Sequence, residues 1–278
     1  MAPEFSVVIP TFGRPEFLAA AIDSVLAQTV TDFEVVVVDD ASPQAAVLPP
    51  DSRVRLVRRA TNGGPPAARN SGIDAAQGRY VAFLDDDDVW TPDRLALARA
   101  GHDRAPVAIC WQATLGDSTT PPHGRRLDGN VGDVVLDGMT PHLGATSIER
   151  ERAPRFDERY GSCEDVDWWL RVAQTLPVTT TPQVGLRYRY HGGPRERTGM
   201  RARVDDAQTL LREHRDWFRA HPHAEAFRLE RLGLSALRVN DRGLALRSFA
   251  RSLRLRPDAR TAWHALRALA PRRAQVDA

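Results

Sequence analysis

The sequence contains no lysine, so all 38 basic side chains among its 278 residues are arginines. Lysine holds phosphates in Walker-type loops and forms Schiff bases, so its absence excludes kinases, Walker-type ATPases and pyridoxal-phosphate enzymes. Only two cysteines occur, Cys110 and Cys163, and no Cys or His residues are spaced as zinc ligands. The sequence therefore indicates neither a disulfide framework nor a structural zinc site. The sequence also has no GxSxG, HExxH or strand-following GxGxxG motif, which excludes the common hydrolase, metalloprotease and dinucleotide-binding patterns.

Long apolar runs are missing as well. No stretch reaches the roughly 18 to 20 residues that span a bilayer, and the first residues lack the basic and apolar segments of a signal peptide. Apolar residues make up 42% and charged residues 27% of the chain, which is typical of a folded globular protein. We expect a cytoplasmic protein, with a peripheral position at a membrane as the alternative.

The arginines are concentrated at one end of the chain. Residues 1–186 carry 17 Arg against 26 acidic residues, whereas residues 187–278 carry 21 Arg against 10. This asymmetry predicts two parts, a domain over 1–198 and a helical extension over 199–278. The basic extension could attract phosphates, an acidic acceptor or a membrane surface; the alternative is a solvated helical surface. No nucleic-acid-binding fold is recognisable in it.

The first part alternates short apolar runs with helical patterns, which predicts an α/β domain with a mostly parallel sheet flanked by helices. The expected strands are Ser6–Pro10, Phe33–Asp39, Val54–Arg58, Tyr80–Leu84, Val107–Gln112, Val134–Leu136 and Val184–Tyr190, and order is expected again at Gly144–Ile148. The expected helices are Pro15–Gln28, Pro65–Ala76, Pro92–Ala100 and Asp165–Thr175. Residues 114–142 are rich in Gly, Pro, Asp and Thr and predict a long loop region.

The sequence beyond about residue 200 is helical throughout. Seven of its residues have the offsets of one tetratricopeptide unit over about 226–259: Leu229, Leu232, Gly233, Ala236, Ala245, Phe249 and Pro257. One such unit cannot bury its apolar face alone. We therefore expect it to pack against the helices predicted at 202–220 and 259–270, or alternatively against a protein partner or a second copy of the chain.

Four consecutive carboxylates, Asp85 to Asp88, directly follow the predicted strand Tyr80–Leu84. Ligands bind at the carboxyl ends of strands in open α/β sheets. Adjacent carboxylates repel one another unless a cation neutralises them, and oxygen ligands suit Mg²⁺ or Mn²⁺ bound together with phosphates. The run therefore predicts a divalent-metal site, and a solvated acidic turn is the alternative.

Two further acidic clusters occupy similar positions. Asp39 and Asp40 end a predicted strand, where a carboxylate can accept from a base or a ribose, although such residues also cap turns. Glu164, Asp165 and Asp167 begin a predicted helix, where acids are favoured for capping reasons alone.

Taken together, four stretches resemble the inverting family 2 glycosyltransferases of GT-A fold: SVVIPTFGR, VVVVDDAS, GGPPAARNSGIDAAQGRYVAFLDDDDVWTPDRL and RFDERYGSCEDVDWWLR. The resemblance covers residues 4 to 192. It implies a metal-dependent enzyme that moves one sugar from a nucleoside-diphosphate sugar to an acceptor hydroxyl or other nucleophile. The QxxRW motif of polymer synthases is absent, so single-sugar transfer is favoured over processive synthesis.

The resemblance also implies roles for individual residues. The nucleotide-sugar site would include Pro10, Thr11, Phe12, Arg14, Asp39, Arg69, Asp86 and Asp87. Asp88 is the first choice for the metal ligand, with Asp86 and His191 completing the site, although four adjacent acids leave the register open by one residue. Asp165 corresponds to the catalytic base, with Glu164 beside it, and Trp168 and Trp169 could form an acceptor platform or pack in the core.

Several choices stay open at this level. UDP or dTDP sugars are the favoured donors, because a carboxylate at Asp39 can accept the N3–H of either base, but guanine also offers N–H groups. A small-molecule, lipid-linked or peptide acceptor is compatible with the sequence. Two other functions are alternatives: a catalytically degenerate domain serving as a protein-binding scaffold, and a sugar nucleotidyltransferase, for which TFGRPEF is a poor phosphate-gripping loop.

Overall fold

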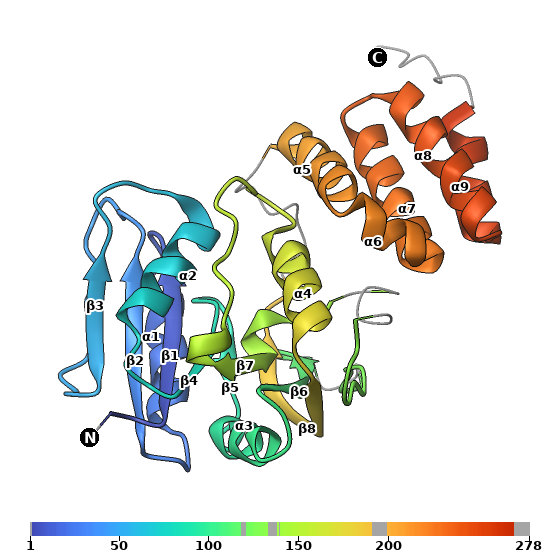
Figure 1. Cartoon of the computed structure of the whole chain (residues 1–278). Helices are drawn as coiled ribbons and strands as arrows, with labels where there is room; N and C mark the ends of the chain where they lie inside the picture. The colour runs from blue at the N-terminus through green and yellow to red at the C-terminus, as the bar shows by residue number, and fades with distance from the viewer. Residues whose placement is uncertain (1, 118–120, 133–137, 139, 191–198, 270–278) are drawn as a thin grey trace. The chain divides into compact units, whose positions relative to one another are not determined.

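A computed structural model describes residues 2–117, 121–132, 138, 140–190 and 199–269. These residues form two compact units, one of 1–135, 139–160 and 164–194, and one of 136–138, 161–163 and 195–278, each taken here over its described residues. We call them the sheet unit and the helical unit (Figure 1).

The sheet unit is built on eight strands in the order β3-β2-β1-β4-β7-β6-β8-β5. The strands are β1 (Phe5–Thr11), β2 (Phe33–Asp39), β3 (Val54–Arg58), β4 (Tyr80–Phe83), β5 (Val89–Trp90), β6 (Val107–Thr114), β7 (Thr146–Glu149) and β8 (Val178–Tyr188). The pairs β1–β2, β2–β3, β1–β4 and β6–β8 are parallel, and the three pairs that involve β7 or β5 are antiparallel. The prediction of an α/β domain with a mostly parallel sheet is confirmed.

α-Helices flank this sheet, and the sheet unit also contains two short 3₁₀ helices, η1 and η2. The elements are α1 (Pro15–Leu26), α2 (Gly64–Ala75), α3 (Arg94–His102), η1 (Leu143–Ala145), η2 (Arg150–Arg152) and α4 (Glu164–Thr175). Every residue of β1 and β2 is buried, as the continuous apolar runs in a covered parallel sheet require. Glycines allow close contact: a Cβ on Gly72 of α2 would lie 2.2 Å from Val8 Cγ1 of β1. Helix α2 is therefore held against the central strand.

Two strands differ from the sequence prediction. Strand β8 begins at Val178, six residues before the predicted start at Val184, because Thr179 to Thr181 are buried beside β6 and their β-branched side chains suit a strand. Strand β5 has only two residues, too few for a periodic pattern, and was not predicted. The predicted strand Val134–Leu136 lies outside the described residues.

The helical unit confirms that the described chain beyond residue 199 is helical. It consists of α5 (Met200–Glu213), α6 (Arg215–Ala220), α7 (Pro222–Arg238), α8 (Arg242–Leu255) and α9 (Ala259–Leu269). A Cβ on Gly233 of α7 would lie 2.5 Å from the Phe249 ring of α8, so a small residue is needed where these two helices meet. Helix α5 packs on α7 and α9 packs on α8, as expected of the neighbours of the pair. The tetratricopeptide assignment of α7 and α8 stays a prediction.

None of the described helices combines the length and the apolar composition needed to cross a bilayer.

Candidate functional site

Three segments meet where the parallel strands β1, β2 and β4 end. Thr11, the last residue of β1, donates its hydroxyl to Asp86 Oδ2 at 2.8 Å, although the two residues are 75 positions apart. The backbone N–H of Gly13 donates to Ser42 Oγ at 2.9 Å, which joins the loop after β1 to the loop after β2. Phe12, between these contacts, keeps 40% of its surface exposed. The sequence motifs at residues 10–14, 39–42 and 85–88 thus form one site.

Arg14 neutralises part of the acidic run. Its Nη1 lies 2.8 Å from Asp87 Oδ2 and 3.6 Å from Asp86 Oδ1. Asp86 is 3% exposed, so its carboxylate needs these donors to offset the loss of water. Arg14, Asp86 and Asp87 were each predicted to bind the nucleotide sugar, and the structure brings all three together.

Arg69 joins the acidic run to the start of α4. Its side chain is 6% exposed, Nη2 donates to Asp85 Oδ1 at 2.8 Å, and Nη1 donates to Glu164 Oε1 at 3.3 Å. Burial opposes the charge on this guanidinium, but Asp85 and Glu164 raise its pKa above the ordinary value. The residues predicted for the donor and for catalysis are therefore connected through one buried cation.

Asp39 and Asp40 support the surrounding loops. Asp39 is fully buried and accepts from the backbone N–H groups of Ser42 and Ala46 at 2.8 and 3.1 Å. Burial alone would raise the pKa of Asp39, but these hydrogen bonds and the charge of Arg58 hold it below its ordinary value. A contact of Asp39 with a nucleobase stays a prediction.

Asp40 supports the loop at the start of α2. It accepts from the N–H groups of Gly63 and Gly64 at the start of that helix and pairs with Arg59 Nε at 2.8 Å. Gly64 has a φ of +78°, a conformation that favours glycine. Asp40 therefore helps to fix the entry into α2, the helix that carries Arg69.

Glu164 and Asp165 open α4. Burial raises the pKa of Glu164 to about 7, the negative charge of Asp165 adds to this rise, and Arg69 opposes it. Asp165 Oδ1 accepts from the N–H of Val166 at 2.8 Å, as acids at helix starts do. Cys163 immediately before them has a φ of +67°, an uncommon conformation for a residue with a side chain. The pair combines a carboxyl that loses its proton only as the pH approaches neutrality with a second acid beside it.

The group that could hold a metal ion differs from the predicted one. Among the described residues, Asp85, Asp88 and His142 each offer a ligand atom, and these atoms lie within 4.8 Å of one another. His142 Nε2 is 3.8 Å from Asp88 Oδ2. Two carboxylates and one imidazole form a donor set that suits Mn²⁺ and, with additional water or phosphate oxygens, Mg²⁺.

This group shares Asp88 with the predicted metal ligands. Asp86, the second predicted ligand, accepts from Thr11 and pairs with Arg14 and is not part of the group, so its role as a ligand stays a prediction. His191 lies outside the described residues. His142 was missed because a single histidine in a Gly- and Pro-rich loop gives no ligand spacing to read. Arg189 was missed too; its N–H donates to Asp88 Oδ1 at 2.8 Å and its Nε donates to the Asp87 carbonyl at 3.2 Å.

The acceptor platform predicted from Trp168 and Trp169 is wrong. Both side chains are 0% exposed, so neither offers a face on which a sugar could stack. Their Nε1–H groups donate to the carbonyls of Pro154 and Pro141, each at 2.9 Å. The Trp168 ring stacks on Phe156 with centroids 5.5 Å apart. The two indoles are core residues that attach α4 to the loops around it.

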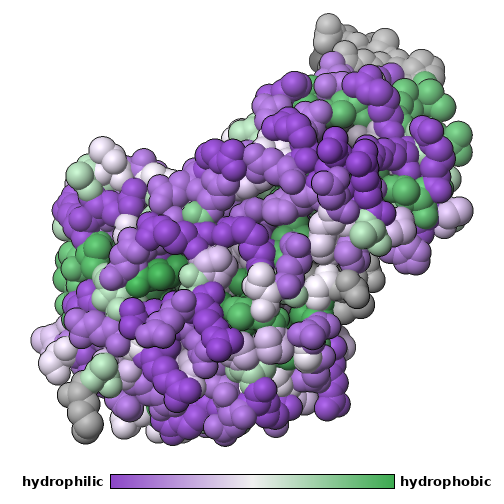
Figure 2. Space-filling model, viewed as in Figure 1, coloured by the Kyte–Doolittle hydropathy of each residue, from purple (hydrophilic) through white to green (hydrophobic). Residues whose placement is uncertain are grey.

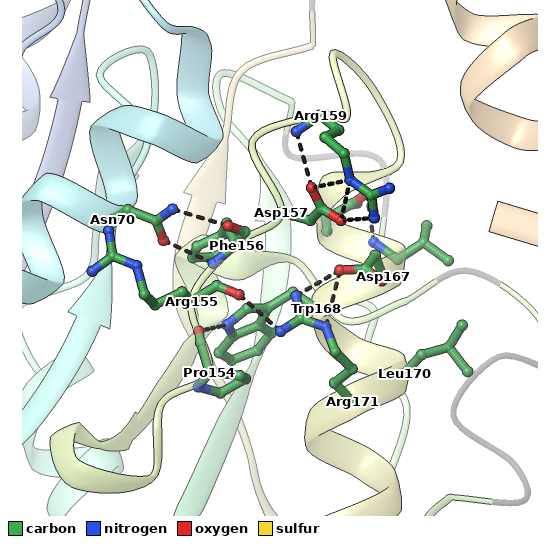
Figure 3. Close-up of polar contacts among 12 residues, drawn as sticks. Asn70, Pro154, Arg155, Phe156, Asp157, Arg159, Asp167, Trp168, Leu170 and Arg171 are labelled. Carbon is green, nitrogen blue, oxygen red and sulfur yellow. Dashed lines mark hydrogen bonds and ion pairs between the residues drawn. The ribbon is translucent and has the colours of Figure 1, made fainter. Parts of the chain in front are cut away.

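Asn70 binds the backbone of the segment that leads to α4 (Figure 3). Its Oδ1 accepts from the Phe156 N–H at 2.7 Å, and its Nδ2 donates to the Phe156 carbonyl at 2.9 Å. Asn70 is 2% exposed, so these bonds are shielded from water. Further along, Arg171 of α4 pairs with Asp167 and donates to the Arg155 carbonyl at 2.8 Å (Figure 3). Helix α2 therefore makes two attachments: Asn70 binds the backbone of this segment, and Arg69 pairs with the carboxylates of Asp85 and Glu164.

Comparison with known sequences identifies related proteins. The profile of a family described as Glycosyl transferase family 2 matches residues 6–157. The Succinoglycan biosynthesis protein ExoW of Rhizobium meliloti (strain 1021) is 43% identical over 122 residues, which cover 41% of this chain and 38% of that protein. The matches cover 38%, 32% and 33% of the length of three curated relatives, so this chain spans well under half of each.

Solved structures share the fold. The 1–349 fragment of S. aureus TarS superimposes with a TM-score of 0.65 at 15% identity, covering 91% of this chain and 81% of the fragment. The same fragment is known in complex with UDP-GlcNAc and with UDP. The mannosyltransferase PcManGT from Pyrobaculum calidifontis, in complex with GDP-Man and Mn²⁺, has a TM-score of 0.59 at 20% identity over 95% of this chain and 78% of its own. The predicted GT-A architecture with a helical extension is confirmed.

Replacing Asn70 tests the attachment of the segment before α4. Asn70→Ala leaves the buried N–H and carbonyl of Phe156 without this partner, so we expect the free energy of unfolding to fall by about 2 kcal/mol. Urea denaturation measures the change. The exposed Asn62→Ala is the control and should be neutral; equal stability of both variants would show that the Phe156 bonds contribute nothing.

The raised pKa of Glu164 predicts a pH-dependent stability. Between about pH 4.5 and 7 the unfolded chain releases this proton while the folded chain keeps it, so the folded state loses stability as the pH rises. Glu164→Gln cannot titrate, so its free energy of unfolding relative to the wild type should rise across this window by up to about 3 kcal/mol. Denaturation at several pH values measures it, with the exposed Glu16→Gln as control. Parallel profiles for the wild type and Glu164→Gln would contradict the assignment.

Proposed function

The chain belongs to glycosyl transferase family 2, and we propose that it transfers a single sugar from a nucleoside-diphosphate sugar to an acceptor nucleophile, with inversion at the anomeric carbon. The observation that carries this proposal is the buried Arg69, which pairs with Asp85 of the acidic run and with Glu164 of the acid pair. A sugar-transfer reaction needs a diphosphate site and a proton acceptor close together, and this cation links the two groups.

The donor site comprises the ends of β1, β2 and β4. Arg14 supplies a positive charge beside Asp86 and Asp87, and its side chain is 32% exposed, so it can reach a diphosphate. A UDP or dTDP sugar is the proposed donor. The complexes of the TarS fragment with UDP-GlcNAc and UDP support uridine, and the complex of PcManGT with GDP-Man makes guanosine the alternative to test.

Asp85, Asp88 and His142 are the residues that would hold a divalent metal ion, Mn²⁺ or Mg²⁺. When bound, the ion would neutralise negative charge on the leaving diphosphate. The Mn²⁺ in the PcManGT complex supports a metal for this fold. The backbone N–H of Arg189 donates to Asp88 and would orient this carboxylate, as groups around metal ligands commonly do.

Asp165 is the proposed base. It would remove the proton of the acceptor as the acceptor oxygen bonds to the anomeric carbon, while the bond from that carbon to the diphosphate breaks and its electron pair leaves with the phosphate. Glu164 holds its proton more readily than an ordinary glutamate, so it adds less negative charge beside the leaving diphosphate. Arg69, which pairs with Glu164, would keep the acid pair near the donor site.

The acceptor is proposed only as a hydroxyl or another nucleophile on a small molecule, a lipid-linked molecule or a peptide. A degenerate scaffold is a weaker proposal, since the acids and arginines required by the reaction are assembled in one place. A sugar nucleotidyltransferase is weaker too, because the loop after β1 contributes a single arginine and no glycine-rich phosphate cradle.

Replacing the base tests the proposed reaction. Asp165→Asn cannot accept a proton, so the release of UDP from UDP-GlcNAc, with water as acceptor, should fall by about 100-fold or more while UDP binding is retained. A coupled assay for UDP and a titration of UDP binding measure the two quantities. The exposed Asp23→Asn should behave as the wild type; an Asp165→Asn variant with full activity would show that another group removes the proton.

The metal ligands are tested by direct binding. Asp88→Asn and His142→Ala should each weaken Mn²⁺ binding by about tenfold or more, because each removes one donor atom. Electron paramagnetic resonance of free Mn²⁺ in the presence of UDP measures the affinity without relying on activity. His123→Ala removes a histidine outside the group and is the control; unchanged affinity in His142→Ala would remove that ring from the site.

A further inference from the structure

Helix α9 has one buried side and one exposed apolar side. Thr261 and Ala268 are buried in the helical unit, whereas Trp263, Leu266 and Leu269 are 52%, 65% and 63% exposed. The spacing of three residues between these apolar side chains places them along one stripe of the helix. Figure 2 shows hydrophobic surface among polar residues over the C-terminal helices. We call Trp263, Leu266 and Leu269 the α9 stripe.

Arginines flank the α9 stripe. Arg260 is 74% exposed along its side chain, and Arg267 lies with its guanidinium carbon 4.6 Å from the centre of the Trp263 ring. From the start of α8 to the end of α9 the chain carries seven arginines and one acidic residue, Asp258. Two of these arginines pair with acids of α7, Arg251 with Glu225 and Arg260 with Glu230, and the segment that contains the stripe still carries an excess of positive charge.

We infer that the α9 stripe and its arginines bind an anionic membrane surface. A helix that lies in a membrane interface presents Trp and Leu to the boundary of the acyl chains and basic side chains to the head groups. Each arginine near an anionic leaflet adds about 1 kcal/mol of attraction. Exposed leucines offer nothing to an acidic polysaccharide or to a nucleotide, so the apolar stripe favours lipid over a soluble polyanion.

Charge also argues against a second copy of the chain as the occupant. A two-fold interface brings the same patch of both copies together. The segment from the start of α8 to the end of α9 has an excess of arginines, so two copies of it placed together would bring like charges near one another, and these repel. An anionic surface removes this repulsion, because the head groups supply the missing negative charge.

Vesicle flotation of the full chain tests the proposal. The wild type should float with vesicles of phosphatidylcholine and phosphatidylglycerol in equal amounts, not with phosphatidylcholine alone, and high salt should release it. The triple variant Trp263→Ala, Leu266→Ala and Leu269→Ala should bind these vesicles about tenfold or more weakly. The double variant Arg260→Gln and Arg267→Gln should also bind about tenfold more weakly.

The matched control is the double variant Arg215→Gln and Arg219→Gln, which removes two exposed arginines of α6 and should bind as the wild type. Circular dichroism checks that each variant keeps its helices. Failure of the wild type to float, or equal binding of the triple variant, would overturn the proposal. A wild type that is dimeric without vesicles, with a monomeric triple variant, would also overturn it by assigning the stripe to a second copy. UDP binding, measured on the same samples, keeps this test separate from that of the proposed function.

Discussion

The site depends on one electrostatic constraint: carboxylates from distant parts of the chain gather in a small volume and repel one another. Arg69 counters the repulsion by pairing with Asp85 and Glu164 from a buried position. A buried cation is favourable only when such partners surround it, so the arginine and the acids need one another to be in place. Asn70, the next residue, binds the backbone of the segment before the acid pair. Gly72 has no Cβ, which allows the same helix to lie close to β1. A short length of α2 thus organises both sides of the site.

The sequence predicted the sheet unit well where hydrophobic patterns are long. Strands β1, β2 and β3 and helices α1 and α2 lie within one or two residues of their expected bounds, because apolar runs in a covered parallel sheet leave few alternatives. The start of β8 was missed because Thr179 to Thr181 are polar in composition but buried in the sheet. Strand β5 was missed because its two residues are defined by pairing with β8 rather than by a local pattern.

The sequence was sufficient to predict which segments form the site, but not which side chains contact one another within it. Acids at strand ends identified the loops after β2 and β4, and the family resemblance identified the loop after β1. Parallel strands end at one edge, but the partner of each carboxylate depends on side-chain directions that spacing does not encode. Asp86 is directed to Thr11 and Arg14, while Asp85 and Asp88 lie near His142 from a loop more than 50 residues away. The position of Trp168 and Trp169 shows the same limit. An aromatic pair beside the proposed catalytic acids suits either a sugar platform or a core, and only the packing against Phe156 and the prolines distinguishes the two.

The attachment made by Asn70 has an evolutionary consequence. Its amide binds the N–H and carbonyl of residue 156, groups that nearly every amino acid possesses, so these two bonds make no demand on the side chain at that position. The side chain of Phe156 is constrained instead by its packing against the Trp168 ring. The backbone anchor thus adds no sequence constraint of its own to the segment that leads to the proposed catalytic acids.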